Sequence, residues 1–423
     1  MKKYLKKLPP ELKKIINLVR DISEEIKMPA YLVGGFVRDL LLGVDNFDLD
    51  ITVEGNGISF ARKLAKKLKS KIIIHERFGT ASLTLDNCLK VDLATTRKEK
   101  YPTLASLPVV SLGSLEEDLR RRDFTINAMA INISKDESQA LIDPFGGKND
   151  LKKRKIRILH NSSFQDDPTR ILRAIRFEQR FNFKIEAKTL VLLKQAIKDG
   201  LLKKVHAHRM RDDLILMLKE KNPFKQIDRL ADLKGLVFLN EGLKFNKTTQ
   251  RLFKLADNQI CWFMKNYPNR RQLDSWLIYL ILLLKPLSFP AMGSIALKLG
   301  LRKGETKRII NYHQESQKII ASLNKKGITP EHIYLLLEPI SYEEIVILRV
   351  VCQDKYLKRY ITDFLEIYNG MKLCVKGHDL HGLGVLPGPR YQKIFTQVLT
   401  AKLNGLVKNR RQELILIKKL ILN

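Results

Sequence analysis

Several residue types are scarce in this chain. It has 423 residues, of which four are cysteine and two are tryptophan. The cysteines are scattered, with no Cys-x-x-Cys pair, at Cys88, Cys261, Cys352 and Cys374. Such spacing excludes a zinc knuckle and a disulfide-stapled scaffold, and it is typical of a reducing compartment. We therefore expect a cytoplasmic protein.

Long hydrophobic runs are also missing. The longest apolar stretch, from Trp276 to Leu284, is far shorter than the roughly 20 residues that a membrane-spanning helix needs. The first ten residues contain lysines but no apolar core segment, so we expect no secretory signal. The sequence predicts no membrane partner.

Acidic residues are outnumbered: 45 Asp and Glu stand against 77 Lys and Arg, which leaves a net charge of +32. Internal ion pairs cannot neutralise such an excess, so we expect a polyanionic partner, most economically a nucleic acid. A chain of this length can form two to four domains with buried cores.

Hydrophobic periodicity divides the chain near residue 150. Before that point, the expected helices are 11–28, 36–42 and 58–69, and the expected strands are 31–33, 48–53, 71–75, 81–85 and 89–94. After it, strand signals nearly vanish, and helices are expected over 167–181, 186–198, 206–219, 247–265, 272–285, 292–300, 304–322, 330–337, 342–350, 355–369, 390–402 and 410–421. The sequence predicts an α+β protein: an α/β head followed by an all-helical remainder.

A Gly-Gly turn and two acidic residues stand close together near the N-terminus. Gly34 and Gly35 lead from an apolar run into a short helical pattern, where backbone N–H groups can approach a phosphate. Arg38 lies one turn into that helix, within reach of a triphosphate. Asp48 and Asp50 are two apart on a strand, so their carboxylates point to the same side. They form a seat for Mg²⁺, which prefers oxygen ligands. Together these features indicate phosphoryl chemistry.

A second polar group lies just before an apolar stretch. Three consecutive arginines end at Arg122 and are followed by Asp123 and Asn127. Arg122 can meet phosphates, whereas Asp123 and Asn127 suit ribose hydroxyls, which both donate and accept hydrogen bonds. The alternative is a solvated basic face that adjoins a strand.

A third group opens a helical pattern. Asp167 precedes Pro168, a typical helix start, and Asp167, Arg170 and Arg173 fall within about 120° on one helix face. A carboxylate can accept from an exocyclic amine while a guanidinium donates to the adjacent ring acceptor. One Asp–Arg pair therefore suits cytosine and adenine and rejects uracil and guanine. The alternative is an i,i+3 ion pair on a solvated surface.

These segments resemble the motifs of one enzyme family. The pattern Gly-Gly-x-Val-Arg-Asp at 34–39, then Leu-Gly at 42–43 and Asp-x-Asp at 48–50, resembles motif A of the class II tRNA nucleotidyltransferases and poly(A) polymerases, which belong to the DNA polymerase beta-like superfamily. Residues 121–128 resemble motif B, and residues 166–170 resemble motif D. The family implies a catalytic nucleotidyltransferase head at 1–150, a helical neck with a base template at 151–220, a helical body at 221–325 and a tRNA-binding tail at 326–423.

The resemblance also implies roles for single residues. Asp48 and Asp50 would hold two Mg²⁺ ions. The residues placed on the nucleotide are Gly34, Gly35, Arg38, Arg122, Asp123, Asn127, Asp167, Arg170, Arg173 and Arg176. Spacing supports Arg176 least, because it lies about 180° around the helix from Asp167. Asp166 stands where the family has a Glu that positions the arginine, and residues 208–214 resemble motif E, which we interpret as neck scaffolding.

The third catalytic carboxylate has two candidates, Asp92 on an apolar strand and Glu117. We favour Asp92, because superfamily members often place a third acid on such a strand. The alternative is that Asp92 is hydrogen-bonded to Arg97 or Arg38.

The resemblance implies template-independent addition of C and A to the 3′ end of tRNA from CTP and ATP, with the basic body and tail gripping the acceptor stem and T-arm. Family members add CCA, CC only, A only or poly(A). Residues 93–115 correspond to a loop that helps to switch specificity from C to A, and its presence weakens the CC-only interpretation. A non-catalytic RNA-binding protein is the other class of hypothesis, and the intact acids argue against it. No obligate protein partner is inferred.

Overall fold

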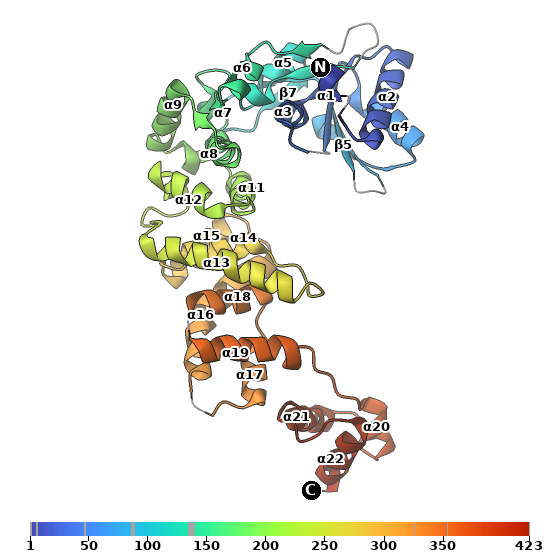
Figure 1. Ribbon diagram of the computed structural model, residues 1–423, viewed down its shortest axis with the longest axis vertical. Helices are drawn as coiled ribbons and strands as arrows, with labels where there is room; N and C mark the ends of the chain where they lie inside the picture. The colour runs from blue at the N-terminus through green and yellow to red at the C-terminus, as the bar shows by residue number, and fades with distance from the viewer. Residues whose placement is uncertain are drawn as a thin grey trace. The chain divides into compact units, whose positions relative to one another are not determined.

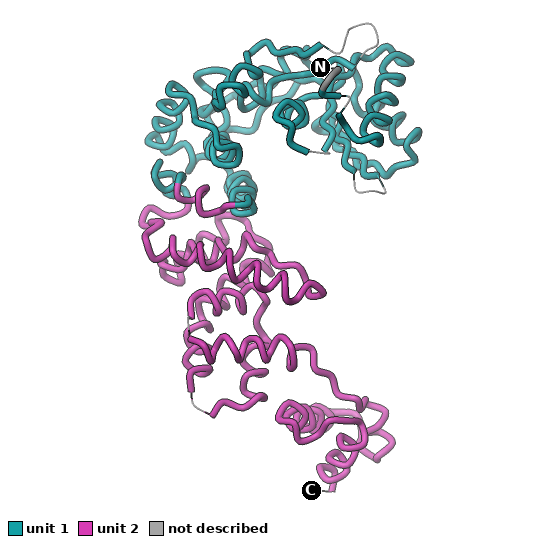
Figure 2. The backbone as a smooth tube through the Cα atoms, viewed as in Figure 1, with its two compact units in different colours: residues 1–221, 229–238 teal, residues 222–228, 239–423 magenta. Residues whose placement is uncertain are grey.

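The computed structural model describes residues 2–5, 7–45, 48–85, 89–133, 140–325, 327–352 and 354–422. The chain forms two compact units (Figure 2), Met1–Lys221 with Arg229–Phe238 and Asn222–Asp228 with Leu239–Asn423. Cys88 lies outside the described residues, and the other three cysteines are free. The α/β head followed by a helical remainder is confirmed. The finer division into head, neck, body and tail stays a prediction.

The first unit is built on a sheet whose blue to teal strands are seen near the N-terminus in Figure 1. The sheet has seven strands in the order β3-β4-β5-β2-β1-β8-β9. Its strands are β1 (Ala30–Val33), β2 (Leu49–Val53), β3 (Lys71–His75), β4 (Thr80–Thr84), β5 (Lys90–Thr95), β8 (Ala130–Asn132) and β9 (Leu141–Ile142). Strand β2 runs antiparallel to β1 and parallel to β5. The β2–β5 register sets Asp50 opposite Asp92. Two predicted carboxylates therefore lie on neighbouring strands.

Helix α3 (Gly34–Leu42) links β1 to the acidic segment. It begins two residues earlier than expected and ends at Gly43, which has a left-handed φ of 68°. Gly34 has a φ of +67°, and a Cβ there would lie 2.7 Å from Nη1 of Arg122. Glycine is therefore required at this position, both for the backbone conformation and for the close approach of the arginine.

Three helices support this sheet. Helix α3 packs on β1, β2 and β8, while α4 (Gly57–Leu68) covers β3, β4 and β5. Helix α2 (Pro10–Glu25) packs on α4 and β1. The apolar positions of α2 and α4 that recur at helical spacing are the buried ones, as expected for amphipathic helices on a sheet.

The segment between β5 and α5 (Leu115–Arg120), expected as a loop, contains a hairpin. Strands β6 (Arg97–Lys100) and β7 (Val109–Leu112) pair in a separate two-stranded sheet. Alternate β6 residues are partly buried and exposed, so the hairpin presents one side to the rest of the first unit.

Short helices complete the first unit. They are η1 (Glu76–Phe78), η2 (Thr125–Asn127), α6 (Gly147–Lys152), α7 (Ser163–Asp166), α8 (Thr169–Phe181), α9 (Ala187–Lys198), α10 (Leu201–Lys204), α11 (Ala207–Leu218) and η3 (Gly235–Phe238). Two-residue strands β10 (Lys155–Ile156) and β11 (Lys184–Ile185) pair between them. Helix α8 begins at Thr169 and not at 167, because Asp167 is extended with φ −137° and ψ 92°.

The second unit is helical among the described residues. Its main helices are α13 (Lys247–Asn266), α14 (Ser275–Leu284), α15 (Phe289–Lys298), α16 (Lys303–Leu323), α17 (Pro330–Leu337), α18 (Tyr342–Val351), α19 (Lys355–Asp363), α20 (Gly377–Gly382), α21 (Pro389–Leu403) and α22 (Arg410–Leu422). The long apolar stretch forms α14, whose residues from Trp276 onward are all buried. No helix in the described part of the chain is long and apolar enough to cross a membrane.

Candidate active site

A polar cavity of about 690 Å³ opens in the first unit. Most of the predicted nucleotide and catalytic residues line it: Gly34, Gly35, Arg38, Asp50, Arg122, Asp123, Asn127, Asp167, Arg170 and Arg173. They come from α3, β2, the segment around η2 and the start of α8, which are far apart in sequence. The fold therefore brings the three sequence constellations to one place. Asp48, Asp92 and Arg176 are not part of its lining.

Carboxylates gather at the β2–β5 edge of the site. Asp50 lies in β2 opposite Asp92, and Asp48 directly precedes the strand and is exposed. Burial raises the pKa of the Asp50 carboxyl; the Arg122 charge opposes this, and the charges of Asp92 and Asp48 add to it. A buried carboxylate among like charges is a position that favours a bound cation.

Asp92, the favoured candidate for a third catalytic carboxylate, already accepts two hydrogen bonds. Asp92 accepts hydrogen bonds from Ser82 Oγ at 2.5 Å and from Lys90 Nζ at 2.9 Å. The alternative expectation, a hydrogen bond from Arg97 or Arg38, is wrong among the described residues: Arg97 bonds to Phe78 and Glu99, and Arg38 to Asp39 and Asn127. Glu117 is used elsewhere, because its carboxylate caps α5 by accepting from the Ser114 N–H at 2.9 Å. Geometry thus places Asp92, and not Glu117, beside Asp50.

The donor set fits Mg²⁺ through two protein carboxylates. Among the described residues, no group of three or more His, Cys, Asp or Glu side chains is arranged to hold a metal ion. Mg²⁺ does not need such a cage, because it commonly uses one or two carboxylates and completes its shell with water and substrate phosphates. Asp48 and Asp50 supply that number, whereas Asp92 shares its carboxylate with Ser82 and Lys90.

Arg122 and Arg38 differ in how free they are to meet a phosphate. Arg122 donates from Nη2 to Asp118 at 3.0 Å, and its buried Nε has no partner among the described residues. Arg38 is buried and heavily committed: it bonds Asp39 at 2.7 and 2.9 Å and Asn127 at 2.7 Å. Arg38 therefore holds Asp39 and Asn127 in place, and its predicted contact with a phosphate stays a prediction.

The predicted ribose pair is already fully hydrogen-bonded. Asp123 Oδ1 accepts from the Phe124 N–H and from Asn127 Nδ2, both at 2.8 Å. Its Oδ2 accepts from Arg173 Nε at 2.9 Å and Nη2 at 2.6 Å. Burial would raise the pKa of Asp123, but the charge of Arg173 and these hydrogen bonds lower it to about 2. A carboxylate has about four acceptor positions, and four hydrogen bonds already occupy those of Asp123. A ribose hydroxyl could therefore donate to Asp123 only if Arg173 released one of its two hydrogen bonds.

The predicted base-reading arginine is held differently from expectation. Arg170 donates from Nη1 to Ser163 Oγ at 2.6 Å and from Nη2 to the Arg121 carbonyl at 2.7 Å. Asp166, expected to position it, instead lies 3.8 Å from His160. Among the described residues, Asp166, which stands where the family has Glu, thus makes no hydrogen bond to Arg170.

Arg176 lies apart from the other predicted residues. Its Nη1 is 3.2 Å from Glu220 Oε1, and its guanidinium stacks over the Phe177 ring at 4.7 Å. The helical spacing had already supported it least, and we leave it out of the proposed site.

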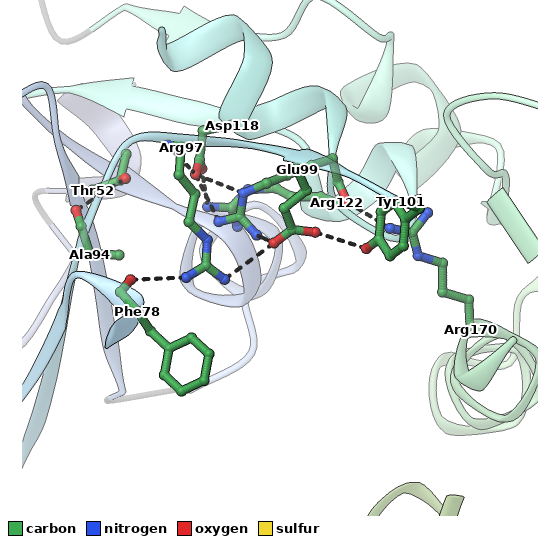
Figure 3. Close-up of polar contacts among 10 residues, drawn as sticks. Thr52, Phe78, Ala94, Arg97, Glu99, Tyr101, Asp118, Arg122 and Arg170 are labelled. Atoms are coloured by element: carbon green, nitrogen blue, oxygen red, sulfur yellow. Dashed lines mark hydrogen bonds and ion pairs between the residues drawn. The ribbon is translucent and has the colours of Figure 1, made fainter. Parts of the chain in front are cut away.

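Two sets of cavity residues were missed as site residues. Glu99 and Tyr101 come from the hairpin end, and Glu99 accepts from Tyr101 at 2.8 Å and from Arg121 at 2.9 Å (Figure 3). The alternation of Arg97, Glu99 and Tyr101 on a strand was a usable signal, because residues two apart share a face.

The second missed set lies on α11. Arg209 and Asp213 line the cavity, although residues 208–214 were interpreted as scaffolding. Burial raises the pKa of Asp213 to about 6; Arg173 and Arg176 oppose this, and Asp167 and Asp123 add to it. The i,i+4 spacing of Arg209 and Asp213 was the available signal in the sequence, because it puts both side chains on one helix face.

Known proteins resemble this chain along most of its length. The poly A polymerase head domain matches residues 30–157. A-adding tRNA nucleotidyltransferases from Geobacter sulfurreducens and Aquifex aeolicus are 36% and 37% identical, over 94% and 81% of this chain and 46% and 41% of the relatives. The chain thus spans less than half the length of these two relatives. An A-adding tRNA nucleotidyltransferase from Halalkalibacterium halodurans is 30% identical over 95% of this chain and 90% of the relative.

Solved structures give a consistent result. A CCA-adding enzyme in an apo form has a TM-score of 0.79 at 33% identity, covering 100% of this chain and 98% of that one. Complexes of a CCA-adding enzyme with ATP and with CTP have TM-scores of 0.76 and 0.75, at the same identity and coverage. The Thermotoga maritima CCA-adding enzyme complexed with tRNA has a TM-score of 0.73 at 32% identity, with 99% and 98% covered. On this evidence the chain belongs to the tRNA nucleotidyltransferase family.

Proposed function

We propose that the protein adds C, A or both to the 3′ end of tRNA, with CTP and ATP as donors. The observation that carries this proposal is the single cavity that Asp50 lines together with Asp123, Asn127, Asp167 and Arg170. A pure RNA-binding protein has no use for carboxylates that face a polyanion. Similarity to CCA-adding enzymes solved with ATP, CTP and tRNA supports the same substrates.

In the proposed mechanism, Asp48 and Asp50 would hold two Mg²⁺ ions, which when bound would lower the pKa of the primer 3′-hydroxyl and offset the negative charge of the triphosphate and pyrophosphate. Arg122 is the guanidinium that we assign to the phosphates, because it lines the cavity and its Nη1 lies beside Gly34, while its Nη2 is held by Asp118. Asp92, fixed by Ser82 and Lys90, adds negative charge behind Asp50.

The remaining residues orient the nucleotide in this proposal. Asp167 accepts from the exocyclic amine of C or A, and Arg170, fixed by two hydrogen bonds, donates to the adjacent ring acceptor. Asp123 and Asn127 check the ribose once Arg173 turns towards the triphosphate. Holding the donor in place is itself a large part of catalysis, since orientation replaces entropy that would otherwise be lost in the transition state.

The tRNA would bind mainly through phosphate charge and duplex shape. The net charge of +32 provides the cations, and duplex RNA is usually recognised through its shape and backbone. We extend the proposal to a cytoplasmic location, where tRNA and both nucleotides are available.

Addition of A alone is the second candidate. The Geobacter, Aquifex and Halalkalibacterium relatives are all named A-adding, at 30 to 37% identity over more than four fifths of the chain. The CCA-adding structures are similar at 33% identity, so both activities stay within the proposal.

The test offers three tRNA primers, ending at the discriminator base, at C and at CC, with CTP or ATP. Sequenced products from all three primers indicate CCA addition. Extension of the CC primer alone, by ATP alone, indicates A addition. If no primer is extended by either nucleotide under saturating Mg²⁺, the proposed function is wrong.

A further inference from the structure

Helix α11 places two charged residues next to Asp167, just before α8, and Arg173 within α8. Arg209 Nη2 lies 2.8 Å from Oδ1 of Asp167, and Asp213 Oδ1 lies 3.8 Å from Nη1 of Arg173. Arg209 and Asp213 are one helical turn apart, so they share a face of α11. Arg209 is therefore paired with the opposite charge of Asp167, and Asp213 with that of Arg173.

Contacts to Asp167 converge on a single oxygen. Oδ1 accepts from the Thr169 N–H at 3.1 Å and from Thr169 Oγ1 at 2.7 Å, in addition to its ion pair with Arg209. Oδ2 has no partner among the described residues. Asp167 lines the cavity with 18% of its side chain exposed, so Oδ2 is the oxygen left for a ligand.

Two directions of contact fix the plane of this carboxylate. Both Thr169 donors come from the first residue of α8. On their own they would leave the Asp167 carboxylate able to rotate. Arg209 reaches the same oxygen from a different helix as a half-buried ion pair, in which the opposite charges attract more strongly than they would in water. Arg209 is itself held in a half-buried place, with 19% of its side chain exposed and a buried Nη1 that has no partner among the described residues.

We propose that Arg209 is a positioning residue for base selection: it holds Asp167 so that its free oxygen faces the exocyclic group of the incoming base. This inference rests on the proposed function, and it assigns a specificity role to a residue that touches neither metal nor phosphate.

The chemistry follows from what each base presents there. The amine of cytosine or adenine donates to a fixed, ionised Oδ2, whereas the carbonyl of uracil or guanine meets a negative oxygen and is repelled. Without Arg209, the carboxylate can turn aside and relieve that repulsion. Arg170 still disfavours the wrong bases, because its own two hydrogen bonds are unchanged, so selectivity should fall but not vanish.

The test measures kcat/KM for each of the four triphosphates on the primer that the wild type extends. Arg209→Met keeps the apolar stem and removes the donors, and Arg209→Lys keeps a charge and a donor. Arg211→Ala is the matched control, since Arg211 is on the same helix but pairs with the exposed Asp212. Arg209→Met should lower the preference for CTP or ATP over UTP and GTP by about tenfold, the order of effect expected when one half-buried ion pair is lost. Arg209→Lys should restore part of it, and Arg211→Ala should match the wild type.

A double-mutant comparison isolates the route through Asp167. In an Asp167→Ala background, Arg209→Met should change selectivity little, because the group it positions is absent. An equal loss for all four triphosphates with the preference intact would show that Arg209 is merely structural. A lower KM for CTP or ATP with unchanged preference would show that Arg209 competes with the base for Asp167. Either result overturns the inference while the proposed function stands, whereas a wild type that extends no primer overturns both.

Discussion

Asp213 gives the first unit a stability that depends on pH. Its pKa is about 6 in place of 3.8, because burial and the charges of Asp167 and Asp123 outweigh the attraction of Arg173 and Arg176. This difference corresponds to roughly 3 kcal/mol in favour of the protonated carboxyl. The contribution to stability is fully present below pH 3.8 and is lost as the pH rises through about 6.

Asp213→Asn removes this titration. We therefore expect the free energy of unfolding of the first unit in the variant, relative to the wild type, to increase by ~3 kcal/mol between pH 4 and pH 8. Any constant packing effect of the Asn cancels, because only the change with pH is compared.

The measurement is amide hydrogen exchange in strands β1 and β5 as a function of denaturant at both pH values. Trp262 and Trp276 both belong to the second unit, so their fluorescence reports on the unit that should not respond. Asp212→Asn is the matched control, since the side chain of Asp212 is 62% exposed. A difference between Asp213→Asn and wild type that stays constant from pH 4 to pH 8 would refute the reasoning.

Three further predictions concern the template, the hairpin and the RNA. Arg170→Ala should let UTP and GTP compete with CTP and ATP, at a cost of roughly 1–3 kcal/mol in discrimination. Asp166→Ala should keep the preference, because Ser163 and the Arg121 carbonyl hold the guanidinium of Arg170. Incorporation of single nucleotides measures the preference of both variants. Glu99→Gln removes the charged partner of Arg97 and one of the two carboxylates that hold Arg121, which keeps Asp118. It should lower the unfolding free energy of the first unit by about 3 kcal/mol in a denaturant titration. The affinity for tRNA should fall steeply between 50 and about 200 mM salt. An affinity that does not change over this range would exclude contacts to the tRNA phosphates as the main source of binding.

Residues close in sequence were the most predictable part of the site. The sequence placed Gly34, Gly35 and Asp50 in one site, because strand alternation and a glycine turn are local properties, and the structure brings these three residues to one cavity. Binding of phosphate and metal there stays a prediction. The helical remainder followed equally from periodicity. Even here the exact starts of α3 and α8 differed by two residues, since helix ends depend on capping contacts that the pattern does not contain.

Contacts between distant segments could not be read in advance. The spacing on α8 placed Asp167 and Arg170 on one face, but it could not show that Ser163 and a carbonyl, and not Asp166, would hold the arginine. The partnership of Arg173 with Asp123 spans fifty residues. Such pairs depend on how the sheet and helices pack, a tertiary property that a single sequence leaves open.

The most direct test of the proposed catalytic centre compares the wild type with Asp50→Asn. Incorporation of labelled CMP or AMP from the triphosphate into tRNA is measured under saturating Mg²⁺, and tRNA affinity is measured in parallel. The substitution keeps the shape of the side chain and removes the charge that we propose holds metal, while the basic surface is untouched. We predict that the wild type incorporates label and that Asp50→Asn loses almost all incorporation with nearly unchanged affinity. Wild-type turnover in the variant would contradict the account.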